Sequence, residues 1–259
     1  MKINSNYFKK KNIIITGANQ GLGLEMAKHF YKLGANIIIC ARNNEKLKNV
    51  KKILKKNKAQ IIIIEKCDVS KFKQVDLFFD RIIKKIKKID ILINNAGIYG
   101  PKGEIEDLSW KDFKKTFEIN LFGSIYLIKK VIPHFKKYNK GKIVQMSGGG
   151  AASPLPYFSA YATSKAGIVR FIENISKELE SYKIDINAVA PGPVWNELLE
   201  RAHAGRDKEE MQEYYRESQP MKFLGDSSDV ANGILYLASD AARYVTGTIF
   251  RIDAGRGAD

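Results

Sequence analysis

Short apolar runs alternate along the chain with longer stretches in which apolar residues recur at helical spacing. In the first hundred residues the runs are almost entirely apolar, which is typical of strands buried on both faces of a sheet. They are Asn12–Ile15, Asn36–Cys40, Ile61–Glu65 and Ile89–Ile93. The stretches between them have the periodicity of amphipathic helices and cover Leu24–Leu33, Lys46–Lys56 and the segment with Val75, Phe78, Phe79 and Ile82.

The alternation continues in the second half, with helices expected over about 110–138 and 157–182 and strands over 142–147, 185–189 and 248–252. Strands that alternate with helices form a parallel sheet with right-handed crossovers. No internal repeat or low-complexity linker divides the chain. We predict an α/β fold: a single Rossmann-type, doubly wound domain over residues 1–259, with a mostly parallel seven-stranded sheet and helices on both faces.

The composition is that of a globular protein with a strongly positive net charge. Of 259 residues, 44% are hydrophobic and 28% are charged, and the formal net charge is +16. A basic field attracts polyanions. However, the lysines lie on the polar faces of predicted helices, and no nucleic-acid recognition motif accompanies them. We expect no nucleic-acid partner, although the charge would steer small anionic ligands.

No apolar run has the length needed to cross a bilayer, and Met1–Lys11 lacks the apolar core of a signal peptide. We expect a cytoplasmic protein without a membrane partner. Cys40 and Cys67 each follow a strand-like run and show no paired-thiol spacing. We expect both to be buried thiols, with no disulfide and no metal site.

A glycine cluster lies between the first predicted strand and the first predicted helix. In this position Gly17 permits a tight turn, Gly21 lets the backbone approach a pyrophosphate, and Gly23 allows close helix packing. Free backbone N–H groups at the helix N-terminus then face the anion. The spacing is Gly-x-x-x-Gly-x-Gly, and together with its flanking strand and helix it favours dinucleotide binding.

The ends of the following strands indicate which dinucleotide binds. Arg42 comes directly after the second strand, where an acid would select NAD and an arginine can pair with a 2′-phosphate. NADP(H) is therefore favoured, with NAD as the less favoured alternative. After the third strand Asp68 is placed to meet the adenine, and Ser70 is expected to cap the next helix. Asn94–Gly97, after the fourth strand, suits the ligand crevice of an open parallel sheet.

Tyr161 and Lys165 lie four positions apart on a predicted helix, so that an ammonium is placed beside a phenol. A neighbouring cation favours the phenolate and lowers the pKa of a tyrosine toward the range useful for proton transfer. Ser147, at the end of a predicted strand, would hydrogen-bond the same carbonyl oxygen. The spacing alone is common in helices, so the prediction depends on the other motifs.

Taken together, the motifs resemble those of the short-chain dehydrogenase/reductase family, in its compact single-domain branch. The resemblance spans nearly the whole chain, with the motifs in the family's order and spacing. The residues that carry it are Thr16, Gly17, Gly21, Gly23, Asp68, Val69, Asn94–Gly97, Asn120, Ser147, Tyr161, Lys165, Pro191, Gly192 and Val194.

The resemblance implies a carbonyl–alcohol oxidoreductase in which Tyr161 is the general acid or base. Lys165 would lower its pKa and hold the nicotinamide ribose, Ser147 would polarise the carbonyl, and Asn120 would anchor a water that relays protons. The cofactor residues implied are Gly17, Asn19, Gln20, Gly21, Leu22, Gly23, Arg42, Asp68, Val69, Asn95, Ala96, Gly97, Tyr161, Lys165, Pro191, Gly192, Val194 and Asn196.

Two regions bear on the substrate. The family commonly has threonine where this chain has Asn196, which changes the contact expected with the nicotinamide carboxamide. Residues 193–222 correspond to the family's substrate lid, and the glycines at 148–150 are expected to leave room for substrate. In the lid, the side chains that could recognise a phosphate, carboxylate or sugar are Arg201, His203, Arg206, Tyr214 and Tyr215. His134 is expected on a helix surface.

The residues do not decide the substrate, and the resemblance favours a 3-oxoacyl thioester or a keto-sugar or nucleotide sugar. Two other interpretations stay open: a sugar-nucleotide epimerase or dehydratase, whose relatives are usually longer, and a cofactor-sensing protein without catalysis. The resemblance also implies a homo-oligomer, a dimer or tetramer.

Overall fold

The computed structural model describes residues 6–54, 59–196, 199–200, 203 and 206–257. Seven strands form one sheet in the order β3-β2-β1-β4-β5-β6-β7, and every neighbouring pair is parallel. The sheet was expected to be mostly parallel, and all of its described pairs are. The strands are β1 Asn12–Thr16, β2 Asn36–Ala41, β3 Ile62–Lys66, β4 Ile91–Asn94, β5 Gly141–Met146, β6 Ile184–Pro191 and β7 Ile249–Ile252.

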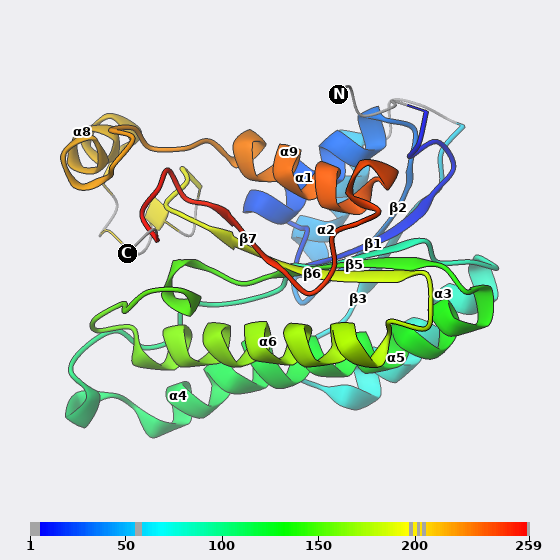
Figure 1. Ribbon diagram of the computed structural model, residues 1–259, viewed down its shortest axis with the longest axis horizontal. Coiled ribbons are helices and arrows are strands. Elements are labelled where there is room, and N and C mark those ends of the chain that lie inside the picture. The colour runs from blue at the N-terminus through cyan, green and yellow to red at the C-terminus, as the bar shows by residue number, and fades with distance from the viewer. Residues whose placement is uncertain (1–5, 55–58, 197–198, 201–202, 204–205, 258–259) are drawn as a thin grey trace.

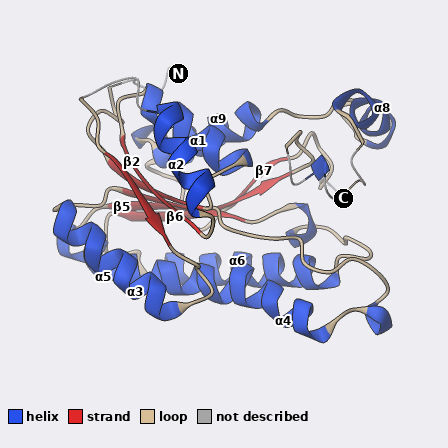
Figure 2. Ribbon diagram, turned by 180° about the vertical axis from the view of Figure 1, so that it is seen from behind, coloured by secondary structure: helices blue, strands red, loops and turns tan. Residues whose placement is uncertain are grey.

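Helices cover both faces of the sheet, as predicted (Figures 1 and 2). Helices α1, α2 and α9 lie on one face, and α3, α5 and α6 lie on the other. The helices are α1 Gly21–Lys32, α2 Asn44–Leu54, α3 Phe72–Lys85, α4 Trp110–Phe117, α5 Ser124–Tyr138, α6 Ser159–Glu178, α8 Lys208–Ser218 and α9 Ser227–Ala238. None of the helices in the described part is long and apolar enough to cross a membrane.

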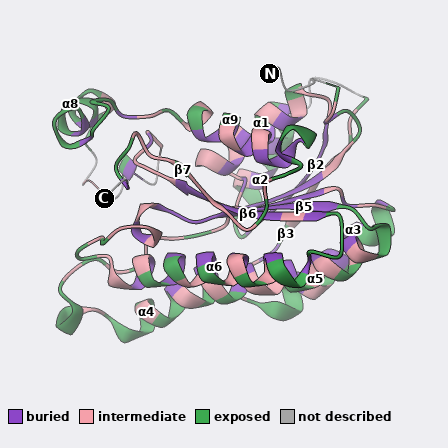
Figure 3. Cartoon of the chain, viewed as in Figure 1, coloured by how far each residue is buried: buried purple, intermediate pink, exposed green. Residues whose placement is uncertain are grey.

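The central strands of the sheet are buried (Figure 3). Each of them supplies side chains to two separate cores, because successive residues of a strand point to opposite faces. In β1, Ile13 and Ile15 belong to the core under α1, α2 and α9, where Phe30 is fully buried. Ile14 belongs to the opposite core, with Phe78 and Phe79 of α3. The continuous apolar runs of the sequence therefore reflect burial on both faces.

The helix expected over 110–138 is interrupted. Its central part, Glu118–Gly123, is a π-helix between α4 and α5. Such segments insert an extra residue into the helical repeat and often occur at functional sites. Here the π-helix contains the buried Asn120, whose Oδ1 accepts a hydrogen bond from Ile98 in the segment after β4.

Two local expectations need correction. Ser70 does not cap α3: the N-cap is Lys71, and the Ser70 hydroxyl donates to Asp68 Oδ1 at 2.8 Å. The Ser70 hydroxyl therefore binds the Asp68 carboxylate in the same loop instead of the helix backbone. His134 is half-buried, and its Nε2 accepts a hydrogen bond from the Ile89 N–H at 2.9 Å. It therefore fastens the segment that leads into β4 rather than lying free on the surface.

Candidate active site

A cavity lies at the carboxyl edge of the sheet, where the strand order reverses between β1 and β4. Ligands of open α/β sheets bind at this position. The cavity has a volume of about 450 Å³. It brings together most of the predicted cofactor residues: Gly17, Asn19, Gln20, Gly21, Leu22, Gly23, Arg42, Asp68, Val69, Asn95, Ala96, Gly97 and Asn196.

The three glycines of the loop differ in conformation and in the space around them, and the binding of a pyrophosphate at Gly21 stays a prediction. Gly17 has a φ of +66°, and a Cβ there would lie 2.9 Å from the Ala96 Cα. A Cβ on Gly23 would lie 2.7 Å from the Ala18 Cα, so α1 packs closely on the loop. Gly21 has a φ of +54° and nothing within 4 Å of its Cβ position, which leaves its backbone open to the cavity.

Hydrogen bonds fix the two sides of the crevice to each other. Thr16 Oγ1 accepts from the backbone N–H groups of Asn95 and Ala96, both at 2.9 Å, and donates to Asn94 Oδ1 at 3.2 Å. Asn95 Nδ2 returns a bond to the Thr16 carbonyl at 2.9 Å. The carboxyl ends of β1 and β4 are thereby held in one geometry.

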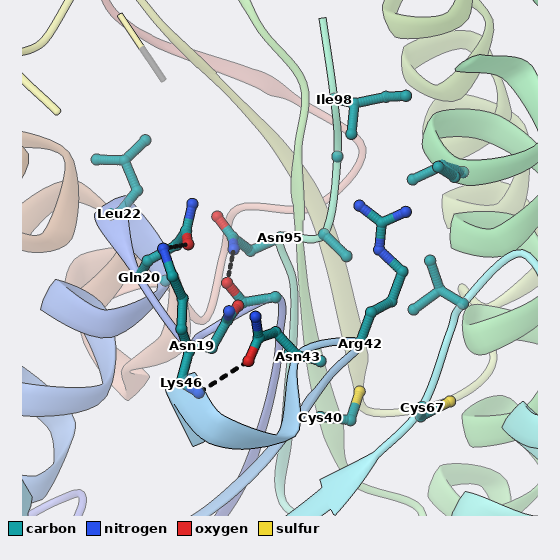
Figure 4. Close-up of a pocket in the computed structure, with 18 of the residues that line it drawn as sticks. Asn19, Gln20, Leu22, Cys40, Arg42, Asn43, Lys46, Cys67, Asn95 and Ile98 are labelled. Atoms are coloured by element: carbon teal, nitrogen blue, oxygen red, sulfur yellow. Dashed lines mark hydrogen bonds between the residues drawn. The ribbon is translucent and has the colours of Figure 1, made fainter. Parts of the chain in front are cut away.

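Two cations line this cavity (Figure 4). Arg42 extends from the end of β2 toward Ile98, and Lys46 comes from the first turn of α2 and donates to Gln20 Oε1. Asp68 is the one carboxylate among the described lining residues, and its Oδ1 already accepts two bonds from Ser70. The two cysteines also line the cavity as buried free thiols.

A second, smaller cavity of about 100 Å³ adjoins the first and shares Leu22, Asn95, Gly97, Ile98 and Asn196 with it. It brings together Ser147, at the end of β5, and Tyr161 and Lys165, one turn apart on α6. The predicted residues Pro191, Gly192 and Val194, at and after the end of β6, lie on its other side. The residues expected to act on a carbonyl therefore converge beside the dinucleotide crevice.

Gly148 makes room for the tyrosine. A Cβ at this position would lie 2.2 Å from the Tyr161 hydroxyl oxygen. Gly148 was expected to leave room for substrate, together with Gly149 and Gly150. Instead, its missing side chain accommodates the Tyr161 hydroxyl, and Gly150 packs against Ala162.

Both members of the Tyr–Lys pair are buried, with 9% and 3% of their surfaces exposed. Burial raises the pKa of Tyr161 above its usual value, and the neighbouring Tyr99 raises it further. Burial lowers the pKa of Lys165 to about 8. Lys165 Nζ donates to the Met146 carbonyl at 3.0 Å and lies 5.6 Å from the centroid of the Tyr161 ring. The shift at Tyr161 is therefore opposite to the one expected from its lysine neighbour, because desolvation dominates.

Asn120 lies behind the cavity wall and is fully buried. Its Oδ1 accepts from the Ile98 N–H at 2.9 Å, and its Nδ2 donates to the Ile98 carbonyl at 2.8 Å and to Ser164 Oγ at 3.1 Å. A Cβ on Gly97 would lie 3.3 Å from Asn120 Oδ1 and 3.4 Å from Lys165 Nζ. Asn120 and Lys165 therefore flank the same glycine.

Asn196 lies where both cavities meet. Its Nδ2 donates to the Val194 carbonyl at 2.9 Å, and its Oδ1 accepts from the Leu199 N–H at 3.1 Å. The Asn196 side chain therefore accepts a hydrogen bond from the backbone at Leu199 and also lines both cavities. Of the lid residues singled out from the sequence, Arg201 lies outside the described residues.

Comparison with known proteins identifies the family. Residues 17–256 match the family model described as Enoyl-(Acyl carrier protein) reductase. The chain belongs to the short-chain dehydrogenase/reductase family. It is therefore an oxidoreductase of the class that interconverts CH–OH and C=O groups.

Individual members of the family resemble this short-chain dehydrogenase/reductase over almost their full length. The 3-oxoacyl-[acyl-carrier-protein] reductase of Rickettsia felis is 32% identical over 245 residues, covering 95% of this chain and 96% of that protein. Levodione reductase superimposes with a TM-score of 0.92 at 29% identity, covering 97% of this chain and 99% of the other. ElxO, solved with NADP bound, has a TM-score of 0.89 at 31% identity and covers 96% and 100%.

The structure of this short-chain dehydrogenase/reductase adds residues that the sequence prediction missed. Tyr99 lines the smaller cavity, and its ring centroid lies 4.9 Å from that of Tyr161. Leu199 closes the same cavity, and Lys46 adds a second cation to the larger one. Lys46 lies in the first turn of α2, four residues after Arg42, and its closeness to the end of the second strand was the available signal. Tyr99 carries no such signal, because it follows the glycine turn in an irregular segment.

Proposed function

We propose that this protein is an NADP(H)-dependent carbonyl reductase or alcohol dehydrogenase in which Tyr161 is the general acid or base. The observation that carries the proposal is the convergence of Ser147, Tyr161 and Lys165 on one small cavity that adjoins the glycine-loop crevice. A carbonyl in the small cavity then has a hydroxyl donor on one side and the dinucleotide on the other.

The raised pKa of Tyr161 suits the direction of carbonyl reduction. A general acid must be protonated at the start, and burial keeps the phenol in that form at neutral pH. The proton moves from Tyr161 Oη to the carbonyl oxygen, which Ser147 Oγ holds by a second hydrogen bond. NADPH, when bound, supplies the hydride that completes the reduction. The charge of Lys165 stabilises the phenolate that remains.

The proton that Tyr161 gives up must be replaced from solvent. Lys165, with a pKa of about 8, changes protonation state close to neutral pH. Asn120 Oδ1 and Lys165 Nζ both lie next to the Cβ position of Gly97, and the Asn120 amide is held by two hydrogen bonds with the Ile98 backbone. We assign these two residues to the path that reprotonates Tyr161, in keeping with the family's use of an asparagine-bound water.

The cofactor assignment rests on charge. Arg42, just after β2, and Lys46, in the first turn of α2, place two cations in the lining of the larger cavity, and either can pair with a 2′-phosphate. NADH lacks this phosphate. The occurrence of NADP in the structure of ElxO supports the same assignment.

For the substrate we propose a 3-oxoacyl thioester or a keto-sugar derivative, supported by the likeness to the 3-oxoacyl reductase of Rickettsia felis. We also propose that residues 193–222 act as a lid of a single domain spanning 1–259. Leu199, Met211 and Tyr215 of this segment form a small apolar cluster with Leu224, which follows it.

We propose a dimer or tetramer for the assembly. Trp110 of α4 and Phe122 of the π-helix keep 64% and 50% of their surfaces exposed, which suits an interface. Light scattering at micromolar concentration measures the assembly. A monomeric mass would contradict this part of the proposal.

The function is tested by comparing cofactor binding with turnover. Fluorescence titration should show tighter binding of NADPH than of NADH, and Arg42→Ala should remove most of the difference. NADPH oxidation is then followed with 3-oxoacyl thioesters, keto-sugars and steroid ketones. Tyr161→Phe should lower kcat by a factor of about 100 or more without weakening NADPH binding. A Tyr161→Phe variant with full activity would overturn the mechanism, and cofactor binding without turnover of any ketone would favour a cofactor sensor.

A further inference from the structure

Beyond the smaller cavity, on the side of Tyr99, three segments bring positive side chains together. Lys102 comes from the connection between β4 and α4, and His203 and Arg206 precede α8. Arg256 belongs to the segment after β7. These residues are far apart in the sequence, so only the tertiary fold places them near one another.

Aromatic contacts link this cluster to the catalytic tyrosine. The centroid of the Tyr99 ring lies 4.9 Å from that of Tyr161 and 5.6 Å from that of Phe158. Lys102 Nζ lies 5.4 Å from the centroid of the Phe158 ring. The rings of Phe158 and Tyr99 therefore lie between the Lys102 ammonium and Tyr161.

The lid supplies the other half of the cluster. The buried Tyr215 of α8 shares a hydrogen bond of 3.1 Å between its hydroxyl and His203 Nε2. The Arg256 guanidinium lies 6.0 Å from the centroid of the same ring, and that of Arg206 lies 5.9 Å from the ring of Tyr214. Burial lowers the pKa of His203, and the charges of Lys102, Arg206 and Arg256 lower it further.

The cations of the cluster, Lys102, Arg206 and Arg256, form no ion pair within the described part of the chain. On the adjacent helix, by contrast, Arg216 pairs with Glu213 and Lys208 pairs with Asp226. Like charges that converge without a partner repel one another, and an anion among them removes that repulsion.

We propose that Lys102, His203, Arg206 and Arg256 bind an anionic group, a carboxylate or a phosphate, at the end of the substrate remote from its carbonyl. This inference rests on the proposed function, because it assigns a substrate class to the same site. Arginine side chains suit either anion through paired N–H donors. The interposed rings of Tyr99 and Phe158 require a spacer, so 2-oxo acids, whose carboxylate adjoins the carbonyl, do not reach the cluster.

A binding experiment tests the anion site without requiring turnover. Calorimetry on the NADP⁺-saturated protein compares hexanoate, hexyl phosphate and the neutral 1-hexanol. We expect at least one anion to bind about tenfold more tightly than the alcohol, and the tighter of the two names the anion. In the Lys102→Gln/Arg206→Gln/Arg256→Gln variant this preference should disappear.

A matched control separates local from general charge effects. Arg243 is exposed and precedes β7, whereas Arg256 follows the carboxyl end of that strand. Arg243 is close in sequence to Val245, whose carbonyl accepts a hydrogen bond from Asn187 of β6. Arg243→Gln should leave the preference unchanged. Arg256→Lys, which keeps the charge, should retain most of it, whereas a purely structural role for Arg256 predicts no such rescue.

Turnover completes the test. The wild-type protein should reduce 7-oxooctanoate with a KM about tenfold below that of its methyl ester. In the triple variant the KM values of the acid and the ester should be equal, and the KM of the ester should be the same as in the wild type. Equal binding of anions and 1-hexanol, or a triple variant that retains the preference, would overturn the inference. If anions bind selectively but neither ketone is reduced, the anion site stands and the proposed carbonyl reduction fails.

Discussion

At the scale of single residues, Gly148 and Tyr161 depend on each other. The hydroxyl of the tyrosine occupies the position that any side chain at residue 148 would need, with only 2.2 Å between that Cβ and the oxygen. The proposed role of Tyr161 as general acid therefore requires glycine at position 148, a residue that itself supplies no acid or base.

We predict that Gly148→Ala displaces the Tyr161 hydroxyl and lowers kcat by a factor of about 100 or more, because general acid catalysis depends on geometry. NADPH affinity, measured by fluorescence, should change little. Gly149→Ala is the matched control, since the nearest atom to its Cβ lies 3.9 Å away. Equal losses in the two variants would show that the loop, rather than the hydroxyl, is affected.

Lys165 illustrates a conflict between function and stability. Burial lowers its pKa from 10.5 to about 8. Between these values the unfolded chain binds more protons than the folded one, so the free energy of unfolding rises with pH in that window. Below about pH 8 the cost of burying the charge is fully present.

We therefore predict that Lys165→Met abolishes turnover but raises the free energy of unfolding at pH 7 by about 2 kcal/mol. The loss of the bond to the Met146 carbonyl reduces the gain. The gain should shrink from pH 8 to 10.5 and vanish above it, as followed by urea denaturation. Lys177→Met, at an exposed position of the same helix, should show no such pH dependence. A destabilised Lys165→Met variant at pH 7 would contradict the prediction.

At the scale of elements, the π-helix Glu118–Gly123 connects a helix to the loop that lines both cavities. Its Asn120 satisfies the N–H and the carbonyl of Ile98 through one buried amide. A buried backbone group that loses its partner is costly. The segment therefore fixes the conformation of the loop after β4 as well as the position of a residue assigned to proton transfer.

We predict that Asn120→Ala lowers the free energy of unfolding by roughly 2–3 kcal/mol, since it leaves buried backbone groups unpaired. Hydrogen exchange should accelerate at the Ile98 amide. The Ala96 amide, which donates to Thr16 Oγ1, should keep its protection and serves as the internal control. Unchanged exchange at Ile98 would show that the loop is held by other contacts.

The elements also show what the sequence can predict. The apolar runs Ile13–Ile15 and Ile37–Ile39 predicted buried parallel strands, because local pattern and burial agree there. The π-helix could not be predicted, because one inserted residue hardly changes the hydrophobic periodicity of a long helix. The segment is also held by a tertiary hydrogen bond from the Ile98 N–H to Asn120, which the local sequence does not reveal. Ser70 was misassigned because Asp68, two residues earlier, offers a competing acceptor.

At the scale of the whole molecule, the glycine loop and the Tyr–Lys pair could be assigned from sequence because a strand or helix orders each motif locally. The cationic cluster could not be assigned from sequence. Lys102 and Arg256 contact different aromatic rings, and both join the cluster only after the sheet, lid and C-terminal segment have packed. The same holds for Tyr99, which lies in an irregular segment and contacts Tyr161 of the distant helix α6.

The net charge of +16 gives a prediction for the molecule as a whole. A positive field accelerates the encounter with an anionic ligand, and salt screens it. We expect the association rate of NADPH, measured by stopped-flow fluorescence, to fall by about tenfold between 10 and 500 mM salt. The KM of a neutral ketone should stay nearly constant. An association rate independent of salt would rule out steering.

The division of the crevice into two cavities has a consequence for biosynthesis. Apart from Asn196, every described residue that lines the larger cavity precedes residue 120, whereas the smaller one needs Tyr161, Lys165 and the segment through Leu199. A chain that leaves the ribosome amino end first thus releases nearly all of the residues that line the larger cavity before Tyr161 has been translated. The nucleotide is available as a template for folding well before the nascent protein can perform chemistry with it.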